Sequence, residues 1–299
     1  MNDDSLIMGN MPLSHHVAVV AGATRGGGRG VAHELGAAGA TVYVTGRSAG
    51  GRRSPMDRPE TLEETAALVD DAGGTAILAP TDHTDPAQVQ ALAERIRREQ
   101  DGRLDLLVNN VWGGDRLTGW GEPFWEHDLG DALEMQRNAV WSHLITAHAL
   151  APLIVERGRG LIVEVTDGIE DRYRGTLPYD LVKSSVIRLA LAEAADLRPH
   201  GVAALALTPG FLRSEAMLDH FGVSAERWRD AIAQDPHFAH SETPRFLGRA
   251  IVALTSDPAI MEKSGGRFAT WSLAHEYGFD DADGTRPDWG AHFATIAPS

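Results

Sequence analysis

The sequence predicts a single α/β domain built on a doubly wound, parallel sheet of seven strands. Three observations predict this fold. Short β-branched runs alternate with longer Ala- and Leu-rich segments, a glycine-rich turn follows the first run, and no repeat or Ser/Gly linker divides the 299 residues. Right-handed crossover connections place helices on both faces of such a sheet. The hydrophobic content of 43% supplies one large core.

The expected strands are separated by helical patterns, of which the longest apolar one covers Leu129–Val155. The strands are predicted at Val17–Ala21, Thr41–Thr45, Thr75–Pro80, Leu104–Asn109, Leu161–Thr166, Val202–Leu207 and, more weakly, Arg267–Thr270. Two stretches depart from the alternation, Ser48–Pro59 and Phe211–Thr243, and long loops in compact domains are often functional. We therefore expect a flexible tail over residues 1–14 and one domain over 15–299. This domain includes a helical substrate lid over about 211–243 and a C-terminal extension over about 272–299.

The composition limits which classes of partner and which cellular compartment we expect. A formal net charge of -15 disfavours nucleic acid and anionic lipid, and the absence of Cys removes disulfides, thiolate metal sites and Cys nucleophiles. Residues 1–14 lack the basic start and apolar run of a signal peptide, and no stretch approaches the roughly 20 apolar residues of a membrane helix. The pairs His143/His148 and His237/His240 lack partners at a recognised metal-ligand spacing. We expect a cytoplasmic protein without a metal, nucleic-acid or membrane partner.

The turn after the first strand has the pattern Gly22-x-x-x-Gly26-x-Gly28 and leads into a helix expected over Val31–Ala38. Glycines at this spacing allow backbone N–H groups and a helix N-terminus to approach a pyrophosphate. A purely structural turn is the alternative interpretation. The strand before the glycines and the helix after them favour nucleotide binding.

The second strand ends at Thr45-Gly46-Arg47, where proteins that bind NAD place an acidic residue for the ribose hydroxyls. A cation there suits a 2′-phosphate, and Arg25 inside the glycine turn supports the same preference because guanidinium groups bind phosphate strongly. Either Arg alone is compatible with a solvated surface charge. Together they favour NADP(H) over NAD(H).

Tyr179 and Lys183 stand at positions i and i+4 of a helix opened by Pro178, so both side chains project from one face. A neighbouring ammonium group favours the phenolate form of a tyrosine and so adapts it to proton transfer. In isolation this spacing also describes an ordinary surface pair. Here it follows a strand in a chain that carries a nucleotide turn.

From about Leu13 to the C-terminus the sequence resembles the short-chain dehydrogenase/reductase family. The family's motifs occur in the family's order: Gly22-x-x-x-Gly26-x-Gly28, Asp82, Asn109-Asn110, Asn138, Tyr179/Lys183 and Pro209-Gly210. The segments Glu242–Arg249 and Trp271–Trp289 further resemble one subgroup of the family. The resemblance implies a Rossmann-type fold.

The resemblance also implies roles for individual residues. Tyr179 would protonate a carbonyl oxygen or deprotonate an alcohol, Lys183 would hold the nicotinamide ribose and lower the pKa of Tyr179, and Asn138 would hold a relay water. Ser214 would contact the nicotinamide carboxamide. The implied cofactor contacts are Gly22, Thr24, Arg25, Gly26, Gly27, Gly28, Arg47, Asp82, His83, Asn109, Tyr179, Lys183, Pro209, Gly210, Leu212 and Ser214.

Three departures from the family pattern concern the site. Gly27 replaces an Ile, which removes packing. Trp112 replaces a Gly, so an indole is expected either at the substrate mouth or in the core. At the strand end Val165-Thr166-Asp167, a gap-free alignment with the family motif places Asp167 at the position of the family's catalytic Ser.

Asp167 is therefore included with Asn138, Tyr179 and Lys183 among the catalytic candidates, and Trp112, Thr166 and Phe211 are assigned to the substrate pocket. An ionised Asp167 accepts a hydrogen bond where Ser donates one. Activity then requires a protonated carboxyl, an inward-turned Thr166, or a substrate hydroxyl or amine that donates to Asp167.

The main function hypothesis is an NADP(H)-dependent oxidoreductase that acts on a small carbonyl or secondary-alcohol substrate. A nucleotide-binding sensor or scaffold of the same fold, with weakened catalysis, is the main alternative, and an isomerase or dehydratase is a third. The long helices Leu129–Val155 and the one after Tyr179 correspond to the family's usual subunit interface. A homodimer or homotetramer follows by analogy.

Overall fold

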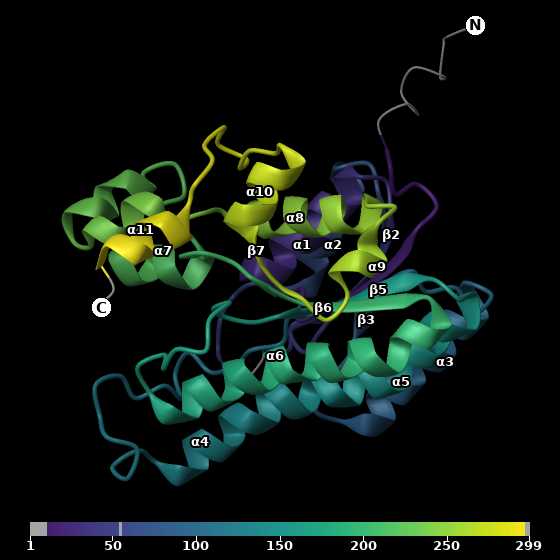
Figure 1. Cartoon of the computed structure of the whole chain (residues 1–299), viewed down its shortest axis with the longest axis horizontal. Helices are drawn as coiled ribbons and strands as arrows, with labels where there is room; N and C mark the ends of the chain where they lie inside the picture. Colours follow the sequence, from purple (N-terminus) through teal and green to yellow (C-terminus); the bar gives the residue numbers. More distant parts are fainter. Residues whose placement is uncertain (1–10, 54–55, 297–299) are drawn as a thin grey trace, which may run out of the picture.

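The computed structural model describes residues 11–53 and 56–296, and in this range the chain forms a three-layered α/β domain (Figure 1). The central sheet has the order β3-β2-β1-β4-β5-β6-β7, and every neighbouring pair is parallel. Its strands are β1 Val17–Ala21, β2 Thr41–Gly46, β3 Thr75–Pro80, β4 Leu106–Asn109, β5 Gly160–Val165, β6 Val202–Thr208 and β7 Arg267–Ala269. The predicted doubly wound, seven-stranded Rossmann-type sheet is confirmed.

Helices cover both faces of the sheet because both faces are apolar. The α-helices are α1 Gly26–Ala37, α2 Leu62–Asp71, α3 Pro86–Glu99, α4 Leu129–Gln136, α5 Ser142–Arg157, α6 Leu177–Leu197, α7 Glu215–Phe221, α8 Pro244–Ser256, α9 Ile260–Lys263, α10 Thr270–Tyr277 and α11 Trp289–Ile296. Helices α1, α2 and α8 pack with one buried cluster, and α3, α5 and α6 pack with the other (Figure 1). This burial on both sides explains why the strands read as continuous apolar runs.

The first helix begins at Gly26, five residues before the predicted start at Val31. The glycines of the turn therefore form the first helical turns. They are required there because a Cβ at Gly28 would overlap the carbonyl oxygen of Gly22, and a Cβ at Gly30 would overlap that of Pro244. The sequence composition alone, rich in poor helix formers, suggested a later start.

The long apolar helix predicted over Leu129–Val155 is interrupted. A π-helical turn over Arg137–Trp141 separates α4 from α5 and carries Asn138. Single π-turns inside helices occur frequently at functional sites. Within the described residues, the stretch Leu129–Arg157 is long and apolar enough to cross a membrane by length and composition alone, and half of its apolar window is buried inside the fold.

The predicted lid is a helical unit with its own small core. Besides α7 it contains the 3-10 helices η4 Trp228–Ala233 and η5 Pro236–His240, and a further short one, η3 Arg198–His200, precedes β6. Phe221, Trp228 and Phe238 form the buried centre of the lid, and Phe211 packs on Phe238. Most of the predicted tail, residues 1–10, lies outside the described residues. The assignment of Leu13 to a flexible tail is wrong, because its side chain is buried in the main core.

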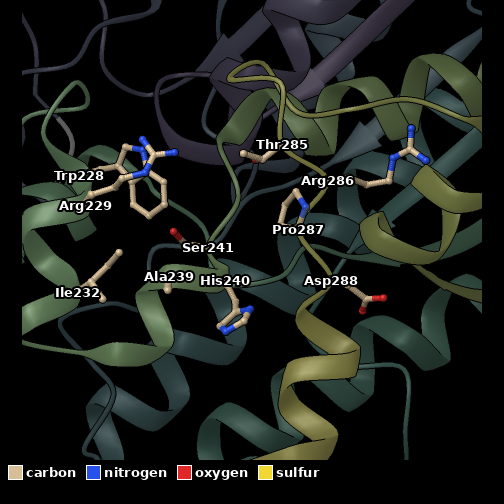
Figure 2. A pocket seen from close by; sticks show the side chains of 10 residues that line it. All are labelled: Trp228, Arg229, Ile232, Ala239, His240, Ser241, Thr285, Arg286, Pro287 and Asp288. Carbon is tan, nitrogen blue, oxygen red and sulfur yellow. The ribbon is translucent and has the colours of Figure 1, made fainter.

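The lid and the C-terminal segment enclose a cavity of about 320 Å³ (Figure 2). Its lining residues are Trp228, Arg229, Ile232, Ala239, His240, Ser241, Thr285, Arg286, Pro287 and Asp288. None of the predicted site residues lines this cavity. The candidate site lies instead at the carboxyl edge of the sheet.

Candidate active site

The loops that follow β1, β4, β5 and β6 meet at the carboxyl edge of the parallel sheet, which is where open α/β sheets bind ligands. Gly22 in the first loop lies against the second: its φ is +80°, and a Cβ there would lie 3.0 Å from the carbonyl oxygen of Asn110. Only glycine allows this approach of two backbones. The glycine pattern therefore has a geometric cause.

Gly27, which the sequence presented as a loss of packing, lies against two leucines and one amide side chain. A Cβ at this position would lie 3.0 Å from Leu247, 3.2 Å from Oδ1 of Asn110 and 3.7 Å from Leu212. Side chains from the β4 loop, the β6 loop and α8 therefore approach the glycine closely.

The N-terminus of α1 already binds an anionic group. The backbone N–H of Gly26 donates a hydrogen bond to Oε2 of Glu215, 2.7 Å away, and Oε1 of Glu215 lies 3.7 Å from Arg29. Helix N-termini favour anions through their free N–H groups and the helix dipole. The turn therefore fits the pyrophosphate of a dinucleotide.

The predicted 2′-phosphate residues lie in a charged corner beyond β2. Arg25 is 3.6 Å from Glu60, which also binds Arg58 at 2.6 Å. On the adjacent strand end, burial opposes ionisation of Asp82. Hydrogen bonds from Thr84 and the charge of Arg47 nevertheless hold the pKa of the Asp82 carboxyl below its usual range. Arg47 and Asp82 thus face the same region.

Two predicted cofactor contacts, His83 and Asn109, have side chains that are bound inside the core. The imidazole of His83 lies between Thr45, at 2.7 Å, and Thr146, at 2.9 Å. The Asn109 amide donates to Glu164 at 2.6 Å and is fully buried. The side chains of both residues are thus engaged inside the fold, and the contact of His83 and Asn109 with the cofactor stays a prediction.

The Tyr179 hydroxyl donates a hydrogen bond to Oδ2 of Asp167 at 2.9 Å. Thr166 is turned away, because its hydroxyl donates to the backbone oxygen of Lys183 at 2.8 Å. Of the two candidates for the position of the family Ser, Asp167 is therefore the side chain that touches Tyr179.

The electrostatic environment of Tyr179 differs from the expectation. Burial, together with the charge and the hydrogen bond of Asp167, raises the pKa of Tyr179 well above 10, whereas Lys183 was expected to lower it. Burial also lowers the pKa of Lys183, while Asp167 and Asp115 oppose that shift. In this arrangement the tyrosine holds its proton, and the difference from the expectation follows from burial first and from the carboxylate at position 167 second.

Aromatic side chains surround the Tyr179 ring. The ring centroids of Trp112 and Trp120 lie 5.4 Å and 5.2 Å from that of Tyr179. The Lys183 ammonium lies 4.1 Å from the centroid of Trp112 and 5.3 Å from that of Tyr179. Trp112 is thus part of the site, while Trp120, with 61% of its surface exposed, forms the rim.

The remaining predicted residues are distributed around the same edge. Asn138 lies in the π-turn with its side chain 3.5 Å from the Cβ position of Gly113, and Ser214 caps α7. The carbonyl of buried Thr24 accepts hydrogen bonds from Arg29 and Thr65. The Pro209-Gly210 turn is fixed by Glu242, whose Oε2 accepts from Gly210 N–H at 2.9 Å.

Sequence reasoning missed Glu215 and Glu242. Glu215 directly follows Ser214, so its place beside a residue predicted to contact the cofactor was a usable signal. Glu242 is 1% exposed, and burial raises its pKa to about 8. Its distance from Gly210 in the sequence gave no signal for this contact.

Fold and site together define a nucleotide-binding α/β protein with a tyrosine and a lysine on one helix face beside the glycine turn. The chain belongs to the short chain dehydrogenase family, whose sequence profile matches residues 16–221. Members of this family are oxidoreductases that use NAD(P).

Relatives cover nearly the whole chain. Human "Dehydrogenase/reductase SDR family member 1" is 34% identical over 91% of this chain and 85% of its own. A "1,6-dihydroxycyclohexa-2,4-diene-1-carboxylate dehydrogenase" of Pseudomonas putida is 33% identical over 86% and 83% of the two chains. A solved structure from Beutenbergia cavernae, described as a candidate NAD(P)-dependent gluconate 5-dehydrogenase with bound NADP at low occupancy, has a TM-score of 0.68. It is 25% identical and covers 88% of this chain and 97% of its own.

Proposed function

We propose that this protein is an NADP(H)-dependent oxidoreductase that moves a hydride between a nicotinamide and a carbonyl or secondary-alcohol carbon, with Tyr179 as the general acid/base. The observation that carries the proposal is the grouping of Tyr179 and Lys183 on α6 beside Trp112, at the sheet edge that also holds the glycine turn. A pure binding module has no need of this pair. The dehydrogenase and reductase names of the relatives support the same class.

The residues present suit NADP(H) better than NAD(H). The N-terminus of α1 would hold the pyrophosphate, Arg25 and Arg47 the 2′-phosphate, Asp82 the adenine, Lys183 the nicotinamide ribose and Ser214 the carboxamide. When bound, the nicotinamide supplies or accepts the hydride. No acidic residue follows β2 to take the ribose hydroxyls of NAD.

Side chains of the protein transfer the proton to or from the substrate oxygen. Tyr179 gives a proton to a carbonyl oxygen or takes one from an alcohol, and its aromatic neighbours Trp112 and Trp120 exclude water from that position. Lys183 places a positive charge beside the ring. Asn138, in the π-turn, is proposed to hold the water that connects Lys183 to solvent.

The substrate is proposed to be a small molecule with a polar group beside the reacting carbon. The Pseudomonas putida relative is named for a compound with hydroxyl groups on adjacent ring carbons. Asp167 supplies a hydrogen-bond acceptor next to Tyr179, and such an acceptor suits a neighbouring hydroxyl. Phe211, on the lid side of the β6 loop, is proposed to form part of the pocket wall.

We further propose a cytoplasmic homodimer or homotetramer without nucleic-acid, membrane or metal partners. The charge of -15 supports the absence of polyanionic partners. Exposed leucines on α4, α5 and α6 support association through those helices, which lie side by side (Figure 1).

A nucleotide sensor or scaffold is the second candidate, and the observation that favours it is the hydrogen bond from the Tyr179 hydroxyl to Asp167, which directs the Tyr179 proton away from a substrate carbonyl. Titration with NADPH and NADH, followed by a panel of carbonyl and alcohol substrates, separates the two functions. Turnover at the nicotinamide absorbance supports the enzyme, and tight NADPH binding without turnover supports the sensor. Failure to bind either nucleotide would overturn both.

A further inference from the structure

The two carboxylate oxygens of Asp167 have different surroundings. Oδ2 accepts the hydrogen bond of Tyr179, whereas Oδ1 has no hydrogen-bond partner within residues 11–53 and 56–296. The side chain is partly exposed at the site. One acceptor oxygen of Asp167 is therefore available to a bound molecule.

The position of Asp167 is set by the loop that precedes α6. Nε of Arg174 donates to the backbone oxygen of Asp167 at 2.7 Å, and the same guanidinium binds Asp180 on α6 at 2.9 Å. These contacts anchor the loop to the helix that carries Tyr179. The contact between Asp167 and Tyr179 is thus built into the fold.

A carboxylate at this position opposes reduction of a simple ketone. Tyr179 has one proton, and a ketone oxygen offers only lone pairs, so the ketone must compete with an ionic acceptor for that proton. An alcohol does not compete, because its O–H donates to a lone pair of the Tyr179 oxygen while the Tyr179 proton remains directed at Asp167. The observed contact therefore suits the alcohol as substrate.

We propose that Asp167 is the terminal proton acceptor of the site and also binds a second hydroxyl group, so that the preferred substrates are vicinal diols that are oxidised to hydroxyketones. This inference rests on the proposed oxidoreductase function and deepens it. The C–H bond of the alcohol breaks as its hydride reduces the oxidised nicotinamide cofactor. The O–H proton passes to the Tyr179 oxygen while the proton of Tyr179 passes to Asp167, which later releases it to solvent.

The second hydroxyl is assigned to Oδ1 of Asp167. The Tyr179 oxygen and the Asp167 carboxylate are adjacent acceptors, which match hydroxyls on adjacent carbons. Trp112 and Trp120, next to the Tyr179 ring, offer apolar surfaces to the carbon skeleton.

Three further charged groups face the Asp167–Tyr179 contact. Lys183 faces it from α6, Arg174 from the loop of Asp167, and Asp115 from the loop after β4. Arg174 lowers the pKa of Tyr179 and Asp115 raises it, both less than burial and Asp167 do.

The substrate test compares cis-1,2-cyclohexanediol with cyclohexanol, using NADP⁺ and the wild type, Asp167→Asn and Asp167→Ser. Wild type should prefer the diol by about 100-fold in kcat/KM, and Asp167→Asn should lose about 100-fold on the diol, within the range of a positioned base. Asp167→Ser should gain about tenfold in the reduction of cyclohexanone. Asp171→Asn, on the same loop but 87% exposed at its side chain, is the matched control and should leave these rates unchanged.

A pH series and a cofactor-free titration separate proton transfer from a structural role. The acid limb of the pH profile of diol oxidation should move in Asp167→Asn relative to the wild type, because the variant lacks the carboxylate to which the Tyr179 proton passes. Ultraviolet titration of the phenolate band, with Tyr179→Phe as the reference, should show a lower pKa for Tyr179 in Asp167→Asn. This last measurement requires no turnover.

Equal kcat/KM values for the diol and the monoalcohol in the wild type would overturn the inference, as would an unchanged pH limb in Asp167→Asn. If the Asp167 variants turn over the diol at the wild-type rate, this inference fails while the proposed oxidoreductase function stands. Absence of turnover on every alcohol and ketone in all variants would overturn the proposed function and this inference with it.

Discussion

The carboxylate of Glu215 accepts a hydrogen bond from the backbone N–H of Gly26, 2.7 Å away, at the N-terminus of α1. Ser214, which caps α7, lies beside the same turn, with its Cβ 3.7 Å from the Cβ position of Gly26. A lid side chain therefore occupies the N-terminus of α1, where the proposed function puts the pyrophosphate. Under that proposal a bound dinucleotide would replace this carboxylate, which would couple the lid to the cofactor turn.

Glu215→Gln should bind NADPH about tenfold more tightly than the wild type. The variant can still accept the Gly26 hydrogen bond, but it removes a negative charge from a phosphate site, and a charge-assisted contact is worth about 1.5–3 kcal/mol. Isothermal titration of the cofactor-free protein measures the change. Glu226→Gln, at an exposed lid position, should bind like the wild type, and weaker binding by Glu215→Gln would contradict the prediction.

Wild type should bind NADPH more tightly than NADH, and Arg47→Glu should reduce or reverse this preference. Each charge-assisted contact of Arg47 or Arg25 to the 2′-phosphate contributes about 1.5–3 kcal/mol, or roughly tenfold and upward in affinity. Titration of both nucleotides against both proteins gives the ratio. Equal affinities of the wild type for NADPH and NADH would refute the assignment of these arginines.

Tyr179→Phe should keep the fold and NADPH binding but lose about 10²–10⁴ in turnover, because it removes the proton donor and little volume. Circular dichroism and nucleotide titration control for folding. The ring contacts with Trp112 and Trp120 remain available to phenylalanine. A variant that turns over at the wild-type rate would remove Tyr179 from the mechanism.

Glu242→Gln should flatten the pH dependence of stability between about pH 5 and 8. Burial raises the pKa of Glu242 from 4.5 to about 8, so the folded state binds this proton more tightly than the unfolded state. Its stabilising contribution is complete below about 4.5 and is lost as the pH rises through about 8, at up to ~1.4 kcal/mol per pH unit. Thermal unfolding from pH 5 to 9 tests this. Identical slopes for the variant and the wild type would show that Glu242 does not titrate this way.

Leu181→Glu should convert the proposed dimer into a monomer. Leu181 is 52% exposed on α6, and Leu133 and Leu144 are 60% and 52% exposed on the adjacent α4 and α5. A charge in the centre of a buried apolar interface is costly. Light scattering after size-exclusion chromatography gives the mass, and a monomeric wild type would count against association through this face.

The strand pattern and the spacing of the glycines were sufficient to predict the sheet and the position of the nucleotide turn. Apolar runs such as Val202–Leu207 are continuous because both faces of the sheet are buried. The sequence pattern alone therefore indicates this burial. The start of α1 at Gly26 was not visible, because helix propensity argues against glycine. Packing of Gly28 on Gly22 and of Gly30 on Pro244 determines it.

The sequence also placed Tyr179 and Lys183 on one helix face, since four residues correspond to about one helical turn. It left Thr166 and Asp167 as alternatives because they are neighbours at a strand end. Only the tertiary structure shows that Thr166 bonds the backbone of Lys183 while Asp167 reaches the Tyr179 hydroxyl. The raised pKa of Tyr179 follows from burial and then from that contact, and neither has a local sequence pattern.

The sequence by itself determined the family, the sheet and the residues of the glycine turn and the Tyr–Lys pair, because periodicity and short-range spacing fix them. The tertiary structure decided which side chains, distant in the sequence, contact the residues of the site. Glu215 reaches Gly26 across 189 positions, and Glu242 reaches Gly210 across 32, so neither contact has a local pattern. The chemistry of the site depends on these contacts because an ionised group changes a neighbour's proton affinity through space, over a few ångströms and independently of sequence separation.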